Sequence, residues 1–258
     1  MTSLTIGAYQ FKGSGDIDKN FHCINKGIRL AADAGVRLLA FHECALTGYP
    51  PLEINIGQID LKKVEAYLSE IKHLAKAFNM YIAVGSVTEK YNKRYNTVEV
   101  FSPLGERLKP YDKRALWGWD RESFTPGKNC DIFLIDKIRI CIRICYVVRF
   151  SEYFRELYRQ DTEFCIVCFC DTSKNENLDR YELIKSHLRT RAVENIMPIL
   201  SVNNACNYQT APTAFFDADG HVLVECERYE IALLVCNLNI CEDDFGRQGR
   251  RYINNSIV

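Results

Sequence analysis

The sequence predicts an α/β fold in which two β-sheets pack together with helices on the outside. Apolar runs of strand length alternate with amphipathic stretches of helix length, and pairs of strands occur between them. Apolar residues make up 47% of the 258 residues, enough for a large core, and the charged fraction of 26% suits a globular chain. No repeat, low-complexity segment or linker divides the sequence, so we expect one domain over residues 1–258.

The first half of the chain predicts strands separated by two helices. Apolar residues at helical spacing run from Phe21 to Ala31 and from Val64 to Phe78, and Gly35 can end the first helix in a left-handed conformation. Two further strands form a hairpin around the turn sequence SPLG. The strands expected in this half are residues 4–10, 36–41, 81–87, 95–101 and 106–111.

The second half predicts a long irregular segment followed by more strands and two helices. Residues 116–130 are rich in Trp, Gly and Pro and lack periodicity, and such a stretch inside a compact domain is often functional. Helices are expected at residues 151–159 and 178–196, and a polar tail at the end. The strands expected here are residues 132–136, 137–145, 164–169, 198–202, 214–216, 222–226 and 231–238.

Charge and hydropathy narrow the class of protein. Lys plus Arg equals Asp plus Glu, both 33, so no net field favours nucleic acid or an anionic membrane. No apolar run is long enough to span a bilayer, and the first residues lack the pattern of a secretory signal. We therefore expect a cytoplasmic protein that binds neither nucleic acid nor membrane.

The twelve cysteines are expected to be mostly thiols, as in a cytosolic protein. The sequence CIVCFC could suggest a metal site. Alternation along a strand, however, puts Cys168 and Cys170 on one face of the sheet and Cys165 on the other, and no paired ligand set follows. We expect no metal site there.

Four residues are candidates for chemistry before any family is considered. Cys145 ends an apolar strand and begins a helix-like segment, a position that lowers the pKa of a thiol and exposes it to a ligand. Glu43 follows a buried run, where an acid needs a partner or a function. By themselves, Cys145 can be a core cysteine and Glu43 a loop carboxylate, and surface charge is the default for Lys113 and Glu122.

Three segments together resemble the nitrilase superfamily, or carbon–nitrogen hydrolases. FHECALTGYPP contains Glu43, YDKRALWGWDRESFTPG contains Lys113 and Glu122, and RICYVVRFSEYFREL contains Cys145, in the order typical of the family. The similarity covers essentially the whole chain. The resemblance implies a nitrilase-like four-layer α-β-β-α sandwich with no metal and no cofactor. It also implies a homodimer or a larger homo-oligomer, paired through the helices near the nucleophile.

The resemblance also implies roles for these residues. Cys145 is expected to be the nucleophile, Glu43 the general base, Lys113 the cation near the oxyanion, and Glu122 a second acid beside them. We expect the substrate to lie against Tyr49, Trp119, Tyr146 and Phe169, on the loops around residues 49, 117–124 and 169–177.

One segment of the sequence is a candidate for the interface between subunits. Tyr153, Phe154 and Leu157 make the predicted helix 151–159 more apolar than one surface helix needs. An exposed apolar patch of this kind usually marks an interface.

The favoured hypothesis is an amidase that releases ammonia from a small carboxamide through a cysteine thioester. Tyr146 stands where true nitrilases usually have tryptophan, which makes nitrilase or N-carbamoyl amidase activity a weaker alternative. LTGYPP resembles the glutaminase portion of NAD synthetases, so a glutaminase module that supplies ammonia to a partner enzyme is a second alternative. Val147 and Ser151 depart from the CYDxRFPE-like pattern and motivate a third, a non-catalytic binding protein.

Overall fold

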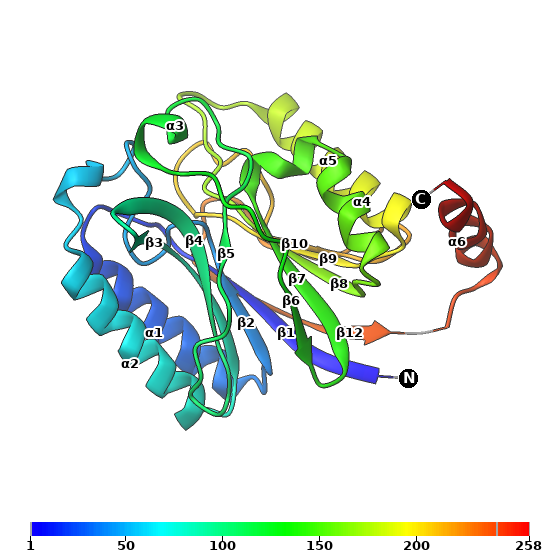
Figure 1. Cartoon of the computed structure of the whole chain (residues 1–258), viewed down its shortest axis with the longest axis horizontal. Coiled ribbons are helices and arrows are strands. Elements are labelled where there is room, and N and C mark those ends of the chain that lie inside the picture. Colours follow the sequence, from blue (N-terminus) through cyan, green and yellow to red (C-terminus); the bar gives the residue numbers. More distant parts are fainter. Residues whose placement is uncertain (1, 241, 258) are drawn as a thin grey trace.

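The computed structural model describes residues 2–240 and 242–257, which form two six-stranded sheets packed face to face between layers of helices (Figure 1). This arrangement confirms the predicted four-layer α-β-β-α sandwich. Among the helices of the described residues, none is long and apolar enough to cross a membrane.

The first sheet has the strand order β12-β1-β2-β3-β4-β5. β1, β2 and β3 are parallel, and the other neighbours are antiparallel. The strands are β1 (Thr2–Gln10), β2 (Leu38–Phe41), β3 (Tyr81–Lys90), β4 (Lys93–Phe101), β5 (Tyr111–Asp112) and β12 (Ala232–Ile240). Helices α1 (Ile17–Asp33) and α2 (Leu61–Ala77) cover its outer face, where Ile24, Ile28, Val64 and Leu68 are buried.

The second sheet has the order β11-β10-β9-β8-β7-β6, with β7, β8 and β9 parallel. The strands are β6 (Ile132–Ile135), β7 (Ile138–Ile144), β8 (Phe164–Cys168), β9 (Ile199–Val202), β10 (Ala214–Phe216) and β11 (Val222–Glu225). Helices α4 (Glu152–Arg159) and α5 (Leu178–Asn195) cover its outer face (Figure 1). The remaining short helices are η1 (Ile56–Gln58), α3 (Asp120–Ser123) and η2 (Cys145–Arg149).

The alternation of side chains along each strand builds the layers. Ile6 of β1 and Ile142 and Ile166 of the second sheet belong to one buried cluster between the sheets. Cys165 and Val167 point instead to the α4–α5 side. Full burial of each large aliphatic side chain stabilises the fold by about 1.5–3 kcal/mol. Because Cys168 lies between the sheets and Cys165 outside, the two lie on opposite faces, as the alternation predicts.

The hairpin predicted around the SPLG turn is only partly present. β4 pairs along its whole length with β3, through a turn at Tyr91 and Asn92. Both turn residues have positive φ, 54° and 59°, as a tight two-residue hairpin turn requires. Residues 106–111 add only a bridge between Phe101 and Arg107 and the start of β5. The turn was missed because it contains no glycine.

The prediction of a polar tail is wrong, because residues Phe245–Ile257 form helix α6 at one end of the molecule (Figure 1). Ion pairs attach the helix to the body: Arg247 and Arg250 both bind Asp219, each at 2.5 Å. Asn254 donates a hydrogen bond to the carbonyl of Glu194 at 2.9 Å. A helix that is attached by polar contacts needs no apolar stripe in its sequence. The helical spacing of apolar residues, on which the prediction relied, is therefore not a signal for α6.

The apolar patch proposed on the predicted helix 151–159 is also wrong. Phe154 and Leu157 of α4 are fully buried in the same chain, against β7, β8 and α5. Tyr153 is half-buried. The argument for an interface from these side chains therefore fails, and the oligomeric state stays a prediction that rests on the resemblance.

Candidate active site

The candidate catalytic residues lie just beyond the ends of three strands. Glu43 follows β2 by two residues, Lys113 follows β5 directly, and Cys145 follows β7 directly. The two sheets meet at this point, because the backbone N–H of Glu43 donates to the carbonyl of Phe169, just after β8, at 3.2 Å. Polar groups at the carboxyl ends of strands from both sheets are thereby gathered in one place.

Glu43 is fully buried and has a hydrogen bond to each carboxylate oxygen. Its Oε1 accepts from Asn96 Nδ2 at 2.6 Å and from Lys113 Nζ at 2.8 Å. Its Oε2 accepts from the backbone N–H of Cys170 at 2.9 Å. Burial raises the pKa of Glu43, Lys113 opposes this shift, and the nearby charge of Asp120 adds to it.

The loop that carries Glu43 depends on a glycine in β3. A Cβ atom at Gly85 would lie 2.2 Å from the carbonyl oxygen of His42 and 2.5 Å from the amide nitrogen of Cys44. Cys44 itself has a φ of 52°, so the chain turns sharply directly after Glu43. The absence of a side chain at Gly85 therefore allows the Glu43 carboxylate to lie at this depth.

Lys113 lies between two carboxylates, and its side chain is fully buried. Its Nζ is 2.8 Å from Glu43 Oε1 and 2.7 Å from Asp120 Oδ2. Burial alone lowers the pKa of Lys113, but the negative charges of Glu43 and Asp120 outweigh it, so the net pKa is raised. The ammonium is therefore a fixed cation at neutral pH.

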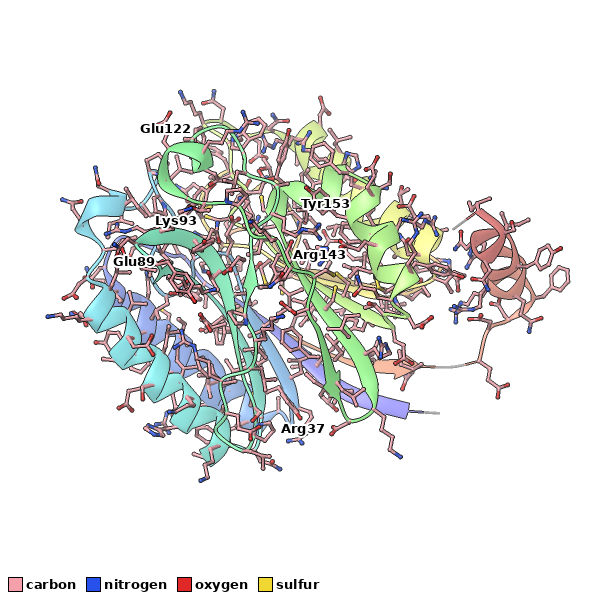
Figure 2. The ribbon with its side chains drawn as sticks, viewed as in Figure 1. Arg37, Glu89, Lys93, Glu122, Arg143 and Tyr153 are labelled. Atoms are coloured by element: carbon pink, nitrogen blue, oxygen red, sulfur yellow. The ribbon has the colours of Figure 1, made fainter. Side chains whose placement is uncertain are left out.

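Asp120, not Glu122, is the second acid of this cluster. Asp120 is fully buried and accepts from the Tyr49 hydroxyl at 2.6 Å and from the Trp117 backbone N–H at 2.9 Å. Glu122 is exposed at the periphery of the molecule (Figure 2). Side chains two positions apart on a helix point about 200° apart, so α3 can turn only one of the two acids inward. The role expected for Glu122 thus falls on Asp120.

Replacing Asp120 or Glu122 with the corresponding amide tests which of the two is the buried acid beside Lys113. Asp120→Asn leaves Lys113 paired with Glu43, but the amide NH2 replaces an oxygen that accepts from a buried donor, either Lys113 and the Trp117 N–H or the Tyr49 hydroxyl. A buried donor left without an acceptor costs about 1–3 kcal/mol, so we expect the free energy of unfolding in urea to fall by about that amount. The matched control Glu122→Gln changes an exposed side chain and should shift it by less than about 0.5 kcal/mol. Equal effects of the two substitutions would contradict the placement of Asp120.

Cys145 occupies a strained turn between β7 and η2. Its φ is 49°, a left-handed conformation of the kind that holds the nucleophile on the sharp strand-to-helix turn of α/β-hydrolases. The thiol is half-buried. Burial raises its pKa, the negative charge of Glu43 adds to this effect, and Lys113 only partly opposes it. The pKa of this thiol is therefore raised and not lowered as expected, because burial, together with the nearby carboxylates, outweighs the single cation.

A small cavity of about 100 Å³ opens above Cys145. Pockets for drug-sized ligands measure about 300–1,000 Å³, so this one suits a compact ligand. Tyr49, Trp119 and Tyr146 line it, as predicted. Other side chains in its wall are Leu52, Trp117, Val148, Arg149, Cys170, Asp171, Thr172, Arg180 and Ile184.

Phe169 does not line this cavity, contrary to expectation. Its side chain is fully buried in the cluster between the second sheet and its helices, because it continues the outward alternation of Val167. Arg149 and Arg180 are the charged wall residues that lay outside the loops expected to form the pocket. Their positions in predicted helical segments resemble those of ordinary surface charges, so no signal in the sequence distinguished them.

A larger cleft of about 800 Å³ lies beneath α6 and shares no residue with the Glu43–Lys113–Asp120 cluster. Its wall mixes arginines with acids, and no cysteine is among the described residues that line it. We therefore place the candidate active site in the smaller cavity. Within residues 2–240 and 242–257, no group of three His, Cys, Asp or Glu side chains is arranged to hold a metal ion.

Comparison with known proteins adds to this geometry. The carbon–nitrogen hydrolase family model matches residues 5–241. The chain is 31% identical over 148 residues to an omega-amidase from Bos taurus, an alignment covering 52% of this chain and 51% of that protein. It is 28% identical over 201 residues to a 2-oxoglutaramate amidase from Bacillus subtilis, and this alignment covers 75% of this chain and 74% of that protein. The chain thus spans about half the length of the bovine relative.

The fold of this chain is also found in solved structures. An amidase from Nesterenkonia sp. superposes with a TM-score of 0.82 at 22% identity, over 99% of this chain and 96% of that one. In a variant of that amidase, the acetamide moiety of fluoroacetamide is added covalently at the active-site cysteine.

Proposed function

The chain belongs to the carbon–nitrogen hydrolase family, and on that premise we propose that it is an amidase releasing ammonia from a small carboxamide through a thioester on Cys145. The observation that carries the proposal is the ammonium of Lys113, held 2.8 Å from Glu43 and 2.7 Å from Asp120, with Cys145 at the adjoining cavity. A buried ion cluster is expensive to maintain, so its presence next to a nucleophile favours catalysis over a binding role.

The first step is attack of the Cys145 sulfur on the amide carbon. Because the pKa of Cys145 is raised, the resting group is a thiol, and a base must take its proton as the carbon–sulfur bond forms. Glu43 is the acid whose charge acts most strongly on this thiol. We assign it as the general base.

The attack turns the amide oxygen into an oxyanion. Lys113 supplies a fixed positive charge, and the backbone N–H of Tyr146, next to the nucleophile, supplies a second donor. Donors arranged in advance around a developing charge contribute strongly to catalysis, and loss of one typically lowers the rate by about a hundred- to a thousandfold.

Collapse of the tetrahedral intermediate breaks the carbon–nitrogen bond. Glu43, now carrying the thiol proton, passes it to the departing nitrogen, and ammonia leaves. A water molecule then gives a proton to Glu43 and attacks the thioester carbonyl. The carbon–sulfur bond breaks, the proton returns to the sulfur, and the carboxylic acid is released with Cys145 restored as a thiol.

Ammonia release from matched amides and nitriles tests the reaction. We expect turnover of short primary amides and a lower specificity constant for the nitriles with the same carbon skeleton. The similarity of the chain to an omega-amidase and to a 2-oxoglutaramate amidase supports an amide substrate. A nitrile preferred tenfold over its amide would reverse the assignment.

We also propose that the enzyme is cytoplasmic and forms a homodimer or a larger homo-oligomer. The cysteines within the described residues are free thiols, as is usual in a reducing compartment. Trp117, Tyr146, Phe150 and Tyr153 form a chain of ring contacts beside the site, in which Trp117 and Phe150 are exposed. Light scattering at micromolar concentration that gives the mass of a single chain would rule out the assembly, and fractionation of cells tests the location.

A further inference from the structure

Two backbone groups just beyond the end of β8 hold the proposed general base from the side of the second sheet. The carbonyl of Phe169 accepts from the Glu43 N–H at 3.2 Å, and the Cys170 N–H donates to Glu43 Oε2 at 2.9 Å. Neither group belongs to a side chain, so the position of both depends on what fixes the backbone around them. Whatever fixes residues 169–171 therefore helps to place the Glu43 carboxylate.

The ladder between β8 and β9 is interrupted at this segment. The Phe169 N–H still donates to the carbonyl of Val202, at 2.8 Å. If the parallel ladder continued, the Asn204 N–H would donate to the Phe169 carbonyl, because the bonds of a parallel pair follow one another at even spacing. The Asn204 N–H donates instead to Oδ1 of the Asn203 side chain, at 2.9 Å. The Phe169 carbonyl is thereby left free for Glu43.

The Asn203 side chain also holds the segment from beyond. Its Oδ1 accepts from the Asp171 N–H at 3.0 Å, and its Nδ2 donates to the carbonyls of Asp171 at 3.0 Å and Ala211 at 2.8 Å. Asn203 is fully buried. Together with the bond from Asn204, these contacts use both donors and both acceptor positions of the amide. An aspartate has no such donors, and a serine has only one.

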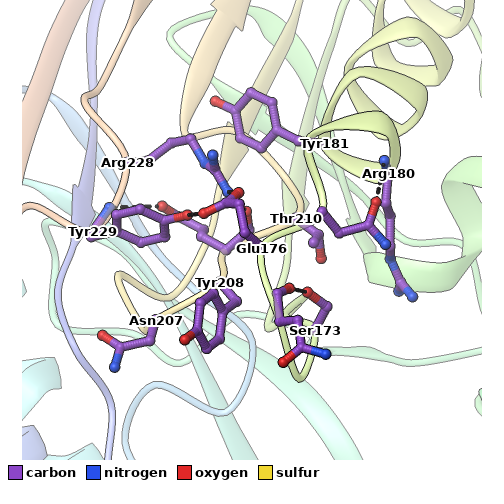
Figure 3. Close-up of polar contacts among 12 residues, drawn as sticks. Ser173, Glu176, Arg180, Tyr181, Asn207, Tyr208, Thr210, Arg228 and Tyr229 are labelled. Carbon is purple, nitrogen blue, oxygen red and sulfur yellow. Dashed lines mark hydrogen bonds and ion pairs between the residues drawn. The ribbon is translucent and has the colours of Figure 1, made fainter.

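Other contacts hold the loop that follows. Asp171 Oδ1 accepts from Arg180 Nη2 at 2.6 Å and from the Thr210 hydroxyl at 2.8 Å (Figure 3). Five residues farther on, the carboxylate of Glu176 accepts two more hydrogen bonds, at 2.7 and 2.5 Å (Figure 3). None of these four bonds involves Asn203. Loss of the Asn203 amide should therefore shift the backbone next to Glu43 without releasing the whole loop.

We propose that Asn203 is a positioning residue for the general base Glu43. Its side chain frees the Phe169 carbonyl for the Glu43 backbone and, by fixing Asp171, holds the Cys170 N–H against the Glu43 carboxylate. Asn203 is not among the described residues that line the cavity, so it acts through the backbone and not on the substrate. This inference rests on the proposed function, in which Glu43 takes the proton of the thiol.

The bond from Cys170 has a consequence that can be measured. A hydrogen bond to the ionised form of a carboxyl group favours that form. Loss of this donor should raise the pKa of Glu43 further above its usual value, in the same direction as burial does. Because Glu43 must be ionised to take the thiol proton, the acidic limb of kcat/KM should then move to higher pH.

The pH profile of kcat/KM in Asn203→Ala tests the inference, with the short amide that the enzyme hydrolyses fastest. A hydrogen bond to a charged group typically changes an equilibrium by about tenfold or more, so we expect kcat/KM on the acidic limb to fall by about tenfold. The loss on the plateau at higher pH should be smaller. Asn203→Ser keeps one hydroxyl and should move the limb less far in the same direction. It provides the same test if the alanine variant does not fold.

Ser201→Ala is the matched control. Ser201 is also fully buried in β9, but its hydroxyl donates to the Pro212 carbonyl at 2.8 Å and accepts from the Ala214 N–H at 3.2 Å, away from residues 169–171. The substitution should lower the urea midpoint and leave the acidic limb in place.

Two results would overturn the positioning role while the amidase stands. One is an acidic limb that stays in place in the Asn203 variants, and the other is a limb that moves as far in Ser201→Ala. If the unchanged protein releases ammonia from no short amide, the proposed function fails, and this inference fails with it.

Discussion

Replacing Cys145 with alanine is expected to abolish amide hydrolysis while the fold stays intact. The thiol is the only group in the cavity proposed to bond covalently with the substrate, and loss of a hydrolase nucleophile typically lowers kcat by about a million-fold. The side chain is half-buried, and the change removes one sulfur atom. We therefore expect a loss of at least about 10⁴-fold in kcat. Ammonia release from a short amide at saturating concentration is the measurement.

The control for this variant is a second cysteine of similar exposure. Cys226 follows β11 and is not part of the cavity wall, so Cys226→Ala should retain full activity. The urea midpoint of both variants should match that of the unchanged protein. Hydrolysis by Cys145→Ala above about one per cent of the original rate would remove Cys145 from the mechanism.

Replacing Glu43 with glutamine should have the second largest effect. General acid–base groups typically contribute about 10²–10⁴ to a rate, and Glu43 is proposed to act in every proton transfer, so we expect kcat to fall by about 10³-fold or more. The amide also presents a donor toward Lys113 and Asn96, or toward the Cys170 N–H, where the carboxylate accepts. This mismatch should lower the free energy of unfolding by about 1–3 kcal/mol.

The dependence of kcat/KM on pH tests separately whether Glu43 is the general base. Burial raises its pKa above the usual 4.5, although Lys113 opposes the shift. The base must be ionised to take the thiol proton, so kcat/KM should fall as the pH drops through a value above 4.5. The residual activity of Glu43→Gln should lack this decline. An unchanged acidic limb in that variant would show that another group titrates.

Most of the layered architecture was predictable because buried helices and strands each space their apolar residues at a characteristic period along the sequence. The helical spacing from Val64 to Phe78 corresponds to α2, and the apolar run 137–145 corresponds to β7. The predicted family and enzyme class, a carbon–nitrogen hydrolase, are confirmed by the match over residues 5–241. These features depend on local pattern and on ordered motifs, and neither requires knowledge of long-range contacts.

The errors occurred where the outcome depends on groups that are distant in the sequence. The inward acid of the DRES sequence is Asp120, because Lys113 and the Tyr49 hydroxyl bind it. Helix α6 depends on Asp219, which binds Arg247 and Arg250. The raised pKa of Cys145 follows first from its burial and then from several nearby charges, and neither is contained in a strand end and a helix start alone. In each case the deciding partner lies outside the local pattern.

The pairing of β12 with β1 has a consequence for synthesis on the ribosome. Residues 2–10 lie beside residues 232–240 in register, so the first sheet reaches its full width only after nearly the whole chain has been made. Until then, one edge of β1 has unpaired backbone groups, the kind of edge that recruits other strands. The delay reaches the segment before β12 too, because Gln10 donates to the carbonyls of Glu227 and Glu230 at 2.8 Å. A nascent chain therefore cannot complete its first sheet before β12 has left the exit tunnel.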